Sequence, residues 1–392
     1  MTNEELLMLI ERGISNFVPQ KELRFEVHIV EHCNLNCKQC SHFSPLAEES
    51  YIDLGEYERD MRRLSDLFDG RMSTVQLLGG EPLLHPEINE IMRITRETFP
   101  IGRIRVVTNG ILLPSMSDEF WEKCREYQVE ISVSPYPINF DYKKWGNIIE
   151  KEKGVSYTPE AFERGRMFKL YPIRTQREPG NDNARRNYFN CVSANSSCIA
   201  LNSGRMYTCC TAANISHLKK HFNLDLPGSE LNGVDIYAVK DGAELLEKLA
   251  KPLPLCEYCD VVNVGKYISS DWGVSKKDRY EWLTFEFKKE DIDYLKEKNL
   301  EVYVFGAGSW GVQTVYRLQK AGIAVKNVLT TRSVEEGRNV LGVPVVCTDD
   351  IQSVSKSSLC LVSLLSPVMK MEVYPTLSNM GFGDVVPVSG LE

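Results

Sequence analysis

The segment His32–Ser41 reads HCNLNCKQCS and places Cys33, Cys37 and Cys40 at spacings of four and three residues. Soft thiolates suit iron–sulfur chemistry, and three of them can ligate three irons of a [4Fe–4S] cluster. No fourth thiolate lies nearby, so one iron would stay open to a small molecule. The alternatives are a zinc knuckle, although zinc sites usually use paired C-x₂-C units, and buried free thiols. The segment therefore predicts an iron–sulfur site with one open iron.

Around this segment, short β-rich runs alternate with helical patterns as far as residue 185. The strands expected are 26–30, 73–78, 103–108 and 129–134, and the helices expected are 56–68, 87–99 and 118–127. Such alternation predicts βαβ units and a parallel sheet. The cysteines, Gly79 and Asn109 each follow a predicted strand. Catalytic and binding residues of parallel sheets and barrels lie at the C-terminal ends of the strands. We therefore expect these groups to lie together at one end of the sheet, in one site.

Three further motifs occur at successive strand ends. Gly79-Gly80-Glu81-Pro82 follows the second strand, Thr108-Asn109-Gly110 ends the third, and Ser132 and Ser134 lie on the fourth. Glycines allow close backbone approach, and a carboxylate can accept a hydrogen bond from an ammonium group. Taken singly, GGEP could be a turn and TNG a common strand-to-helix connection. Their order after successive strands favours a shared role.

These residues resemble the radical S-adenosylmethionine (SAM) superfamily, with its CxxxCxxC loop, GGEP motif and TNG strand end. The resemblance implies a partial (β/α)6 TIM-type barrel whose cluster binds SAM. In such enzymes SAM is cleaved reductively, and the 5′-deoxyadenosyl radical removes a hydrogen atom from substrate. Carried over to this chain, SAM contacts fall to the GGEP and TNG residues and to the strand-end serines. The cofactor-binding residues predicted in this way are Gly79, Gly80, Glu81, Pro82, Thr108, Asn109, Ser132 and Ser134.

A second cysteine set begins at Cys191 and continues with Cys209 and a C-x₂-C pair, Cys256 and Cys259. It resembles the twitch half of the SPASM extension, which implies one auxiliary [4Fe–4S] cluster held by four cysteines. Zinc in a Cys₄ site would use the same ligands. The run CIALNSGRMYTCC predicts a hairpin turning at residues 202–204.

Two neighbouring cysteines leave the ligand set open. Cys198 could replace Cys191 as a ligand. Cys210 is either a buried spare thiol or a catalytic donor of a hydrogen atom to a substrate radical, as an epimerase requires. Cys124, Cys347 and Cys360 lie on predicted helices and strands, and we interpret them as core residues.

The last hundred residues begin with a helix predicted near residues 289–298 and then restart a βαβ pattern. Gly306, Gly308 and Gly311 fit a strand–GxGxxG–helix motif, which predicts a Rossmann-like domain with a phosphate at the helix N-terminus. The following strand ends in Thr331-Arg332 without an acidic residue, so NAD is not supported. The segment is similar to Rossmann-like domains of polysaccharide biosynthesis enzymes. It predicts a nucleotide or nucleotide-sugar ligand, or a scaffold that binds nothing or mediates assembly.

Composition limits the function classes. The net charge of -8 argues against a general nucleic-acid binder. No apolar stretch approaches the roughly 20 residues that span a bilayer, and no secretion signal is visible. We therefore expect a cytoplasmic protein without nucleic-acid or membrane partners. The expected domains are an N-terminal helical arm (1–24), a radical SAM core (25–185), a twitch-like domain (186–270) and a Rossmann-like domain (290–392), with a linker around 272–289.

The leading hypothesis is an oxidoreductase or epimerase that acts on a sugar or nucleotide-linked small molecule. This enzyme would hold one core cluster and one auxiliary cluster. An external electron donor such as flavodoxin or ferredoxin is implied. The alternatives are a peptide-modifying radical SAM maturase, disfavoured by the few residues before the first strand, and a non-catalytic iron–sulfur sensor or assembly protein.

Overall fold

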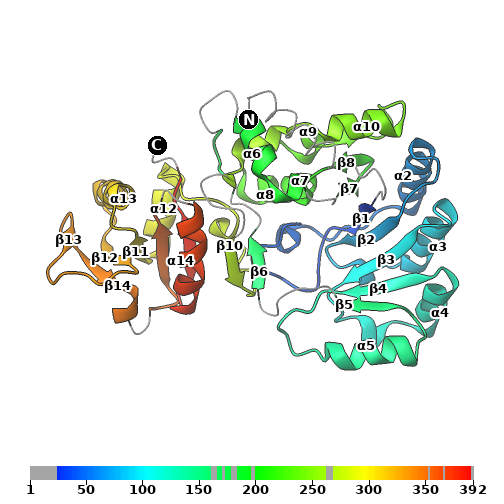
Figure 1. The fold of residues 1–392 in the computed structure, drawn as a ribbon, viewed down its shortest axis with the longest axis horizontal. Helices are drawn as coiled ribbons and strands as arrows, with labels where there is room; N and C mark the ends of the chain where they lie inside the picture. The colour runs from blue at the N-terminus through cyan, green and yellow to red at the C-terminus, as the bar shows by residue number, and fades with distance from the viewer. Residues whose placement is uncertain are drawn as a thin grey trace, which may run out of the picture. The chain divides into compact units, whose positions relative to one another are not determined.

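The computed structural model describes residues 24–159, 166–169, 173–177, 183–195, 199–261, 268–351, 354–364 and 367–389. The chain divides into two units (Figure 1). The first contains residues 1–166, 191–256 and 272–277, and the second contains 167–190, 257–271 and 278–392. Except for Arg24, the predicted N-terminal arm lies outside the described residues, as does Cys198.

The first unit is built on one sheet with the order β5-β4-β3-β2-β1-β7-β8-β9. Its strands are β1 (Arg24–Val30), β2 (Thr74–Gly79), β3 (Arg103–Thr108), β4 (Val129–Val133), β5 (Tyr157–Pro159), β7 (Ile199–Asn202), β8 (Arg205–Tyr207) and β9 (Val234–Asp235). Strands β1 to β5 are mutually parallel, and β7 pairs parallel with β1. The parallel sheet predicted from the alternation is confirmed. The described residues contribute six strands to this parallel series, β1 to β5 and β7, and a (β/α)6 barrel stays a prediction.

The helices of this unit are α2 (Leu54–Leu67), α3 (Ile88–Thr98), α4 (Asp118–Glu126), α5 (Tyr142–Lys151), α7 (Val192–Asn195), α8 (Cys210–Phe222), α9 (Ser229–Asn232) and α10 (Gly242–Leu249). Helices α2, α4 and α5 begin where Asp53, Ser117 and Asp141 accept a backbone N–H at the N-cap. The apolar face of α2 buries Tyr57, Met61 and Leu64 in the core shared with β1 and β2.

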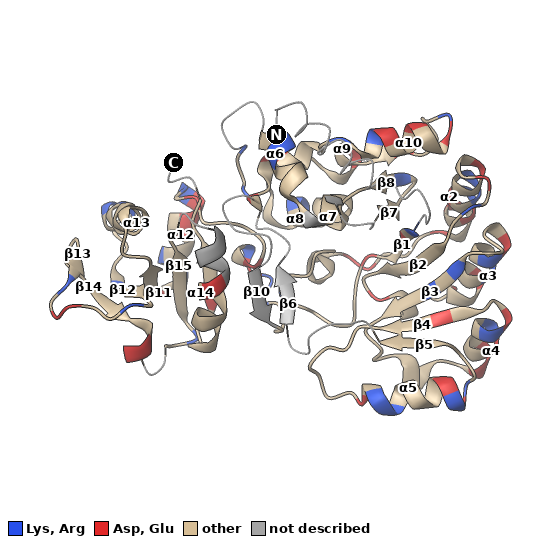
Figure 2. Ribbon diagram, in the orientation of Figure 1, with Lys and Arg blue, Asp and Glu red and all other residues tan. Residues whose placement is uncertain are grey.

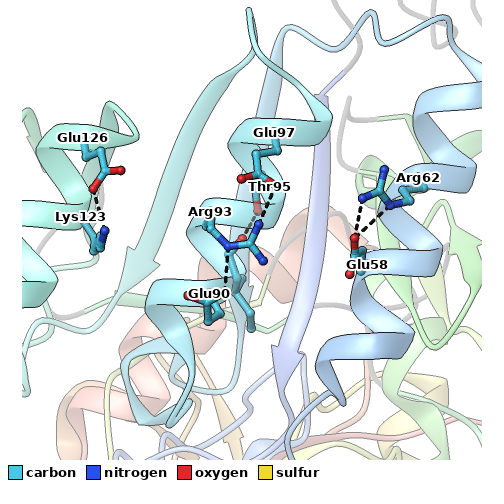
Figure 3. A network of polar contacts seen from close by, with 9 residues as sticks. Glu58, Arg62, Glu90, Arg93, Thr95, Glu97, Lys123 and Glu126 are labelled. Atoms are coloured by element: carbon cyan, nitrogen blue, oxygen red, sulfur yellow. Dashed lines mark hydrogen bonds and ion pairs between the residues drawn. The ribbon is translucent and has the colours of Figure 1, made fainter.

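The opposite faces of α2, α3 and α4 are charged (Figure 2). Ion pairs join Arg62 to Glu58, Arg93 to both Glu90 and Glu97, and Lys123 to Glu126 (Figure 3). Exposed pairs of this kind contribute little to stability, because solvent and salt screen them. The helices are therefore held mainly by their buried apolar faces.

The hairpin predicted at residues 202–204 is confirmed. Strands β7 and β8 pair antiparallel, and Ser203 and Gly204 both have positive φ, at 49° and 68°. Asp60 of α2 accepts a hydrogen bond from the Gly204 amide at 2.8 Å. The hairpin is thus fixed to the same unit as the cysteine loop.

The second unit contains a six-stranded sheet with the order β13-β14-β12-β11-β15-β16. Its strands are β11 (Glu301–Phe305), β12 (Val325–Thr330), β13 (Asn339–Val340), β14 (Val343–Cys347), β15 (Ser358–Val362) and β16 (Asp384–Pro387), all parallel except β13. Its helices are α6 (Asn183–Asn190), α12 (Lys289–Lys298), α13 (Ser309–Lys320) and α14 (Pro367–Asn379). The remaining strands, β6 (Arg166–Lys169) and β10 (Ile268–Asp271), pair with each other. The helix predicted over residues 289–298 is confirmed as α12.

The stretch predicted as a linker, around residues 272–289, contains the passage from the first unit to the second between residues 277 and 278, but much of it is buried rather than solvated. Tyr280, Leu283 and Phe285 are buried, and Asp278 caps a 3-10 turn at Arg279–Glu281. Its charged residues suggested a solvated stretch, but several of them cap turns or helices while the aromatic residues pack inward. None of the helices in the described ranges is long and apolar enough to cross a membrane.

Candidate metal centre

The loop after β1 surrounds its three cysteine sulfurs with hydrogen-bond donors. The Cys33 Sγ accepts from the Leu35 amide at 3.4 Å and from Asn109 Nδ2 at 3.6 Å. The Cys37 Sγ accepts from the indole Nε1 of Trp272 at 3.2 Å. Backbone amides after Cys40 donate to its sulfur. Such donors stabilise thiolates in an iron–sulfur site.

Burial raises the pKa of Cys33 and Cys37 to about 12. Without iron these thiols are protonated, so ligation must release protons. Among the described residues, no three His, Cys, Asp or Glu side chains converge on one metal ion. In a [4Fe–4S] cluster each thiolate binds a different iron. The lack of ligands around one ion in the described ranges therefore does not bear on a cluster at these cysteines. The donor set of Cys33, Cys37 and Cys40 fits such a cluster.

Gly79 and Gly80 let the end of β2 pack against the entry to the cysteine loop. A Cβ on Gly79 would lie 2.2 Å from the Val30 carbonyl oxygen, and one on Gly80 would lie 1.9 Å from that of His32. The amides of Gly80 and Glu81 donate to these same two carbonyls, at 2.6 and 3.0 Å. The glycines are therefore required by the protein's own backbone packing.

Glu81 joins the GGEP motif to the TNG motif. Its carboxylate accepts from Thr108 Oγ1 at 2.6 Å, from the Asn109 amide at 2.9 Å and from the Leu83 amide at 3.1 Å. The side chain is fully buried. Burial raises its pKa to about 7, although the three hydrogen bonds act in the opposite direction. Pro82 follows at the start of a buried 3-10 turn, Pro82–Leu84.

Asn109 in turn reaches the cysteine loop. Its Nδ2 donates to Asn34 Oδ1 at 2.7 Å as well as to Cys33, and its Oδ1 accepts from the Ile111 amide at 3.0 Å. The sequence-predicted residues after β1, β2 and β3 therefore form one hydrogen-bonded group at one edge of the sheet.

The two strand-end serines face different surroundings. Ser132 Oγ accepts a hydrogen bond from Arg105 Nη2 at 2.7 Å, and Arg105 also pairs with Glu130. Ser132 is thus engaged within the sheet. The Ser134 amide donates to the Thr108 carbonyl at 2.9 Å, which brings Ser134 beside the TNG motif. Contact with SAM stays a prediction for both residues.

The second cysteine set is divided between the two units. Cys191 and Cys209 belong to the first unit, and each precedes a helix, α7 or α8, whose first residues hydrogen-bond to its sulfur. Burial raises the pKa of Cys191 to about 12, and the nearby charge of Cys209 adds to the shift. Cys210 is the first residue of α8. Cys256 lies in a 3-10 turn of the first unit, whereas Cys259 lies in the second and pairs with Ile173. A four-cysteine auxiliary site stays a prediction.

The glycines of the C-terminal motif lie between β11 and α13. Gly306 has a φ of 112°, and a Cβ on Gly311 would lie 1.7 Å from the Gly306 carbonyl oxygen. A Cβ on Gly308 would meet no heavy atom of the described residues within 4 Å. Gly306 and Gly311 are thus required for packing, while Gly308 leaves open space at the start of α13.

Sequence reasoning did not predict the contacts of three side chains near the core cysteines. Trp272 lies 235 positions from Cys37, and Tyr136 also donates to that sulfur. Glu31, directly after β1, pairs with His217 of α8 at 2.7 Å and so holds this helix against the strand. No local spacing rule links these residues. Glu31 and Tyr136 stand close to predicted strand ends, whereas no local signal pointed to Trp272.

Residues 27–151 match the sequence model of the Radical SAM superfamily. They form a radical SAM superfamily domain. The GTP 3′,8-cyclase of Chlorobaculum tepidum is 30% identical over 96 residues, covering 24% of this chain and 28% of that protein. The enzyme of the same name from Clostridium acetobutylicum is 30% identical over 109 residues, covering 27% and 33%. The chain thus spans about a third or less of the length of these curated relatives.

Among solved structures, BtrN in complex with AdoMet and 2-DOIA aligns over 67% of this chain and 98% of that chain, with 16% identity and a TM-score of 0.40. SuiB of Streptococcus suis bound to S-adenosylmethionine aligns over 54% and 66%, with 12% identity and a TM-score of 0.28.

Proposed function

We propose that this chain is a radical SAM enzyme that removes a hydrogen atom from a small-molecule substrate. The observation that carries the proposal is the hydrogen-bonded group formed by the cysteine loop, GGEP and TNG motifs within the superfamily domain. A [4Fe–4S] cluster at Cys33, Cys37 and Cys40 would supply the electron that cleaves SAM to the 5′-deoxyadenosyl radical. An external donor such as flavodoxin or ferredoxin would deliver that electron.

The protein's own residues would shape and shield this site. Glu81 is fully buried and, by holding Thr108 and the Asn109 amide, fixes the TNG motif beside Cys33. Asn109 then orients the loop through Asn34. SAM would bind at this edge, where Gly79, Gly80 and Ser134 also lie. Fixed polar groups of this kind position a cofactor and restrict side reactions.

The substrate class we propose is a sugar or nucleotide-linked small molecule, which is oxidised or epimerised. The relatives named GTP 3′,8-cyclase support a nucleotide-linked compound. The open space at Gly308 and the parallel sheet of the second unit support a nucleotide or nucleotide-sugar at Gly306, Gly308 and Gly311.

An auxiliary [4Fe–4S] cluster on Cys191, Cys209, Cys256 and Cys259 would accept the electron released by oxidation. In an epimerisation, the Cys210 thiol would instead donate the returning hydrogen atom, and a proton together with an electron from the external donor would convert the resulting thiyl radical back to the thiol. Deuterium from D₂O should then enter the product with the wild type but not with Cys210→Ala. Equal incorporation by both proteins excludes Cys210 as the donor.

The test of the central proposal is the formation of 5′-deoxyadenosine. The reconstituted, reduced protein is incubated with SAM, alone and with pools of nucleotide-sugars and nucleotides, and the products are quantified by mass spectrometry. We expect 5′-deoxyadenosine from the wild type and at least a hundredfold less from Cys37→Ala. Cys124→Ala, which removes a buried thiol on α4, should keep the activity. Equal, background-level product from all three proteins under every condition would contradict the proposal.

A further inference from the structure

Residues Trp272–Ser275 form a clasp on the cysteine loop. The Lys38 amide donates to the Gly273 carbonyl at 2.7 Å, and the Ser275 amide donates to the Asn36 carbonyl at 2.8 Å. Between these two bonds, Cys37 pairs with Val274 in an antiparallel bridge. Both chain neighbours of Cys37 are therefore tied to a segment more than two hundred residues away, within the same unit.

The clasp also contributes a donor to the Cys37 sulfur. The Trp272 Nε1 lies 3.2 Å from Cys37 Sγ, and an indole nitrogen can only donate. The ring of Trp272 packs near that of Tyr136, with centroids 6.4 Å apart, and Tyr136 also donates to this sulfur. Cys33 accepts from a backbone amide of its own loop and from Asn109 Nδ2, and Cys40 accepts from backbone amides of its own loop. Cys37 differs because aromatic side chains from outside the loop donate hydrogen bonds to its sulfur.

We propose that Trp272 is a positioning residue that sets the reduction potential of the core cluster. Reduction adds an electron that is shared by the iron ions and their sulfur ligands, so a donor to a ligating sulfur stabilises the reduced state more than the oxidised state. Hydrogen bonds to sulfur are among the factors that set the potentials of iron–sulfur clusters. The inference rests on the proposed function, because it requires a cluster at Cys33, Cys37 and Cys40.

Replacing Trp272 with Phe keeps an aromatic ring but removes the N–H donor. At the midpoint potential of the wild type, we expect the ratio of reduced to oxidised core cluster to fall about tenfold. For a one-electron couple this corresponds to a potential lower by about 59 mV. The iron content should stay unchanged, because the backbone bonds of the clasp and the three cysteines remain.

The experiment is an EPR-monitored redox titration of the full, reconstituted chain. The core signal is defined as the one that Cys33→Ala removes. Trp145→Phe, which changes a half-buried tryptophan on α5 of the same unit, is the matched control and should titrate as the wild type does. If Trp272→Phe loses iron, 3-benzothienylalanine at position 272 replaces the N–H by sulfur at nearly constant shape and should show the same tenfold fall.

The proposal is overturned if the redox titration curve of either cluster-containing Trp272 variant superimposes on that of the wild type. It is also overturned if a variant loses iron while its remaining core cluster keeps the wild-type potential. The readout needs no turnover. A wild type that forms the cluster but yields no 5′-deoxyadenosine contradicts the proposed function, and the Trp272 shift can still be measured. A wild type without any core cluster contradicts both.

Discussion

The carboxyl group of Glu81 is surrounded by donors from its own chain, and its burial has a consequence for the pH dependence of stability. Three donors, from Thr108, Asn109 and Leu83, face the two carboxylate oxygens. Even so, burial keeps the pKa at about 7, above the ordinary value of 4.5. Near neutral pH the folded protein therefore holds a proton that an exposed glutamate would release.

Glu81→Gln should remove this pH dependence. Between pH 4.5 and 7 the folded state binds a proton that the unfolded chain has lost, so the contribution of Glu81 to the free energy of unfolding is full below pH 4.5 and falls as the pH rises to 7. At about 1.4 kcal/mol per unit, the loss is roughly 3 kcal/mol. Urea unfolding at several pH values should show the wild type losing stability relative to Glu81→Gln across this window.

The control is Glu126→Gln, which changes an exposed carboxyl group on α4 paired with Lys123. Its stability should follow the wild type between pH 4.5 and 7. If the free energies of unfolding of Glu81→Gln and the wild type changed in parallel with pH, Glu81 would not be protonated in the folded state.

At the scale of elements, the end of β2 and the start of the cysteine loop depend on each other. The amides of Gly80 and Glu81 bond to carbonyls at the end of β1 and at His32. These contacts place the GGEP motif beside the loop before any ligand is considered. The sequence predicted this proximity from strand order, but it could not show that the glycines serve backbone packing, because the partner carbonyls are distant in the chain.

Gly80→Ala should separate these two elements. The new Cβ would lie 1.9 Å from the His32 carbonyl oxygen, and a backbone atom cannot rotate away. Overpacking usually costs about 1–3 kcal/mol, and we expect the upper end of this range together with reduced iron retention, since His32 precedes Cys33. Denaturant unfolding and iron analysis of the reconstituted protein measure both effects.

Gly273→Ala is the matched control, because a Cβ there would meet no heavy atom within 4 Å in the part of the chain that the structure describes. It should keep the stability and iron content of the wild type. A Gly80→Ala variant that matched Gly273→Ala in both measurements would show that the β2 end can move away from His32 without consequence.

At the scale of the whole molecule, local patterns predicted the elements well and long-range contacts poorly. Helix α12 and the turn at Ser203–Gly204 follow from apolar spacing and turn residues, which are local signals. The clasp at Trp272 and the buried Tyr280 and Phe285 lay in a charged stretch that suggested a linker. Their burial depends on partners that no local pattern reveals.

The two cysteine sets predict the metal content of the whole chain. Two cubic clusters require about eight irons per chain, and Cys209→Ala should lower this number to about four while the core cluster remains. Iron, sulfide and zinc are measured together on the reconstituted protein, with Cys124→Ala as a control that removes a buried thiol near Met92. About four irons with one zinc that Cys209→Ala removes would identify the second set as a zinc site. A third outcome is about four irons and no zinc in the wild type, with the same content in Cys209→Ala. This would show that the second cysteine set binds neither metal.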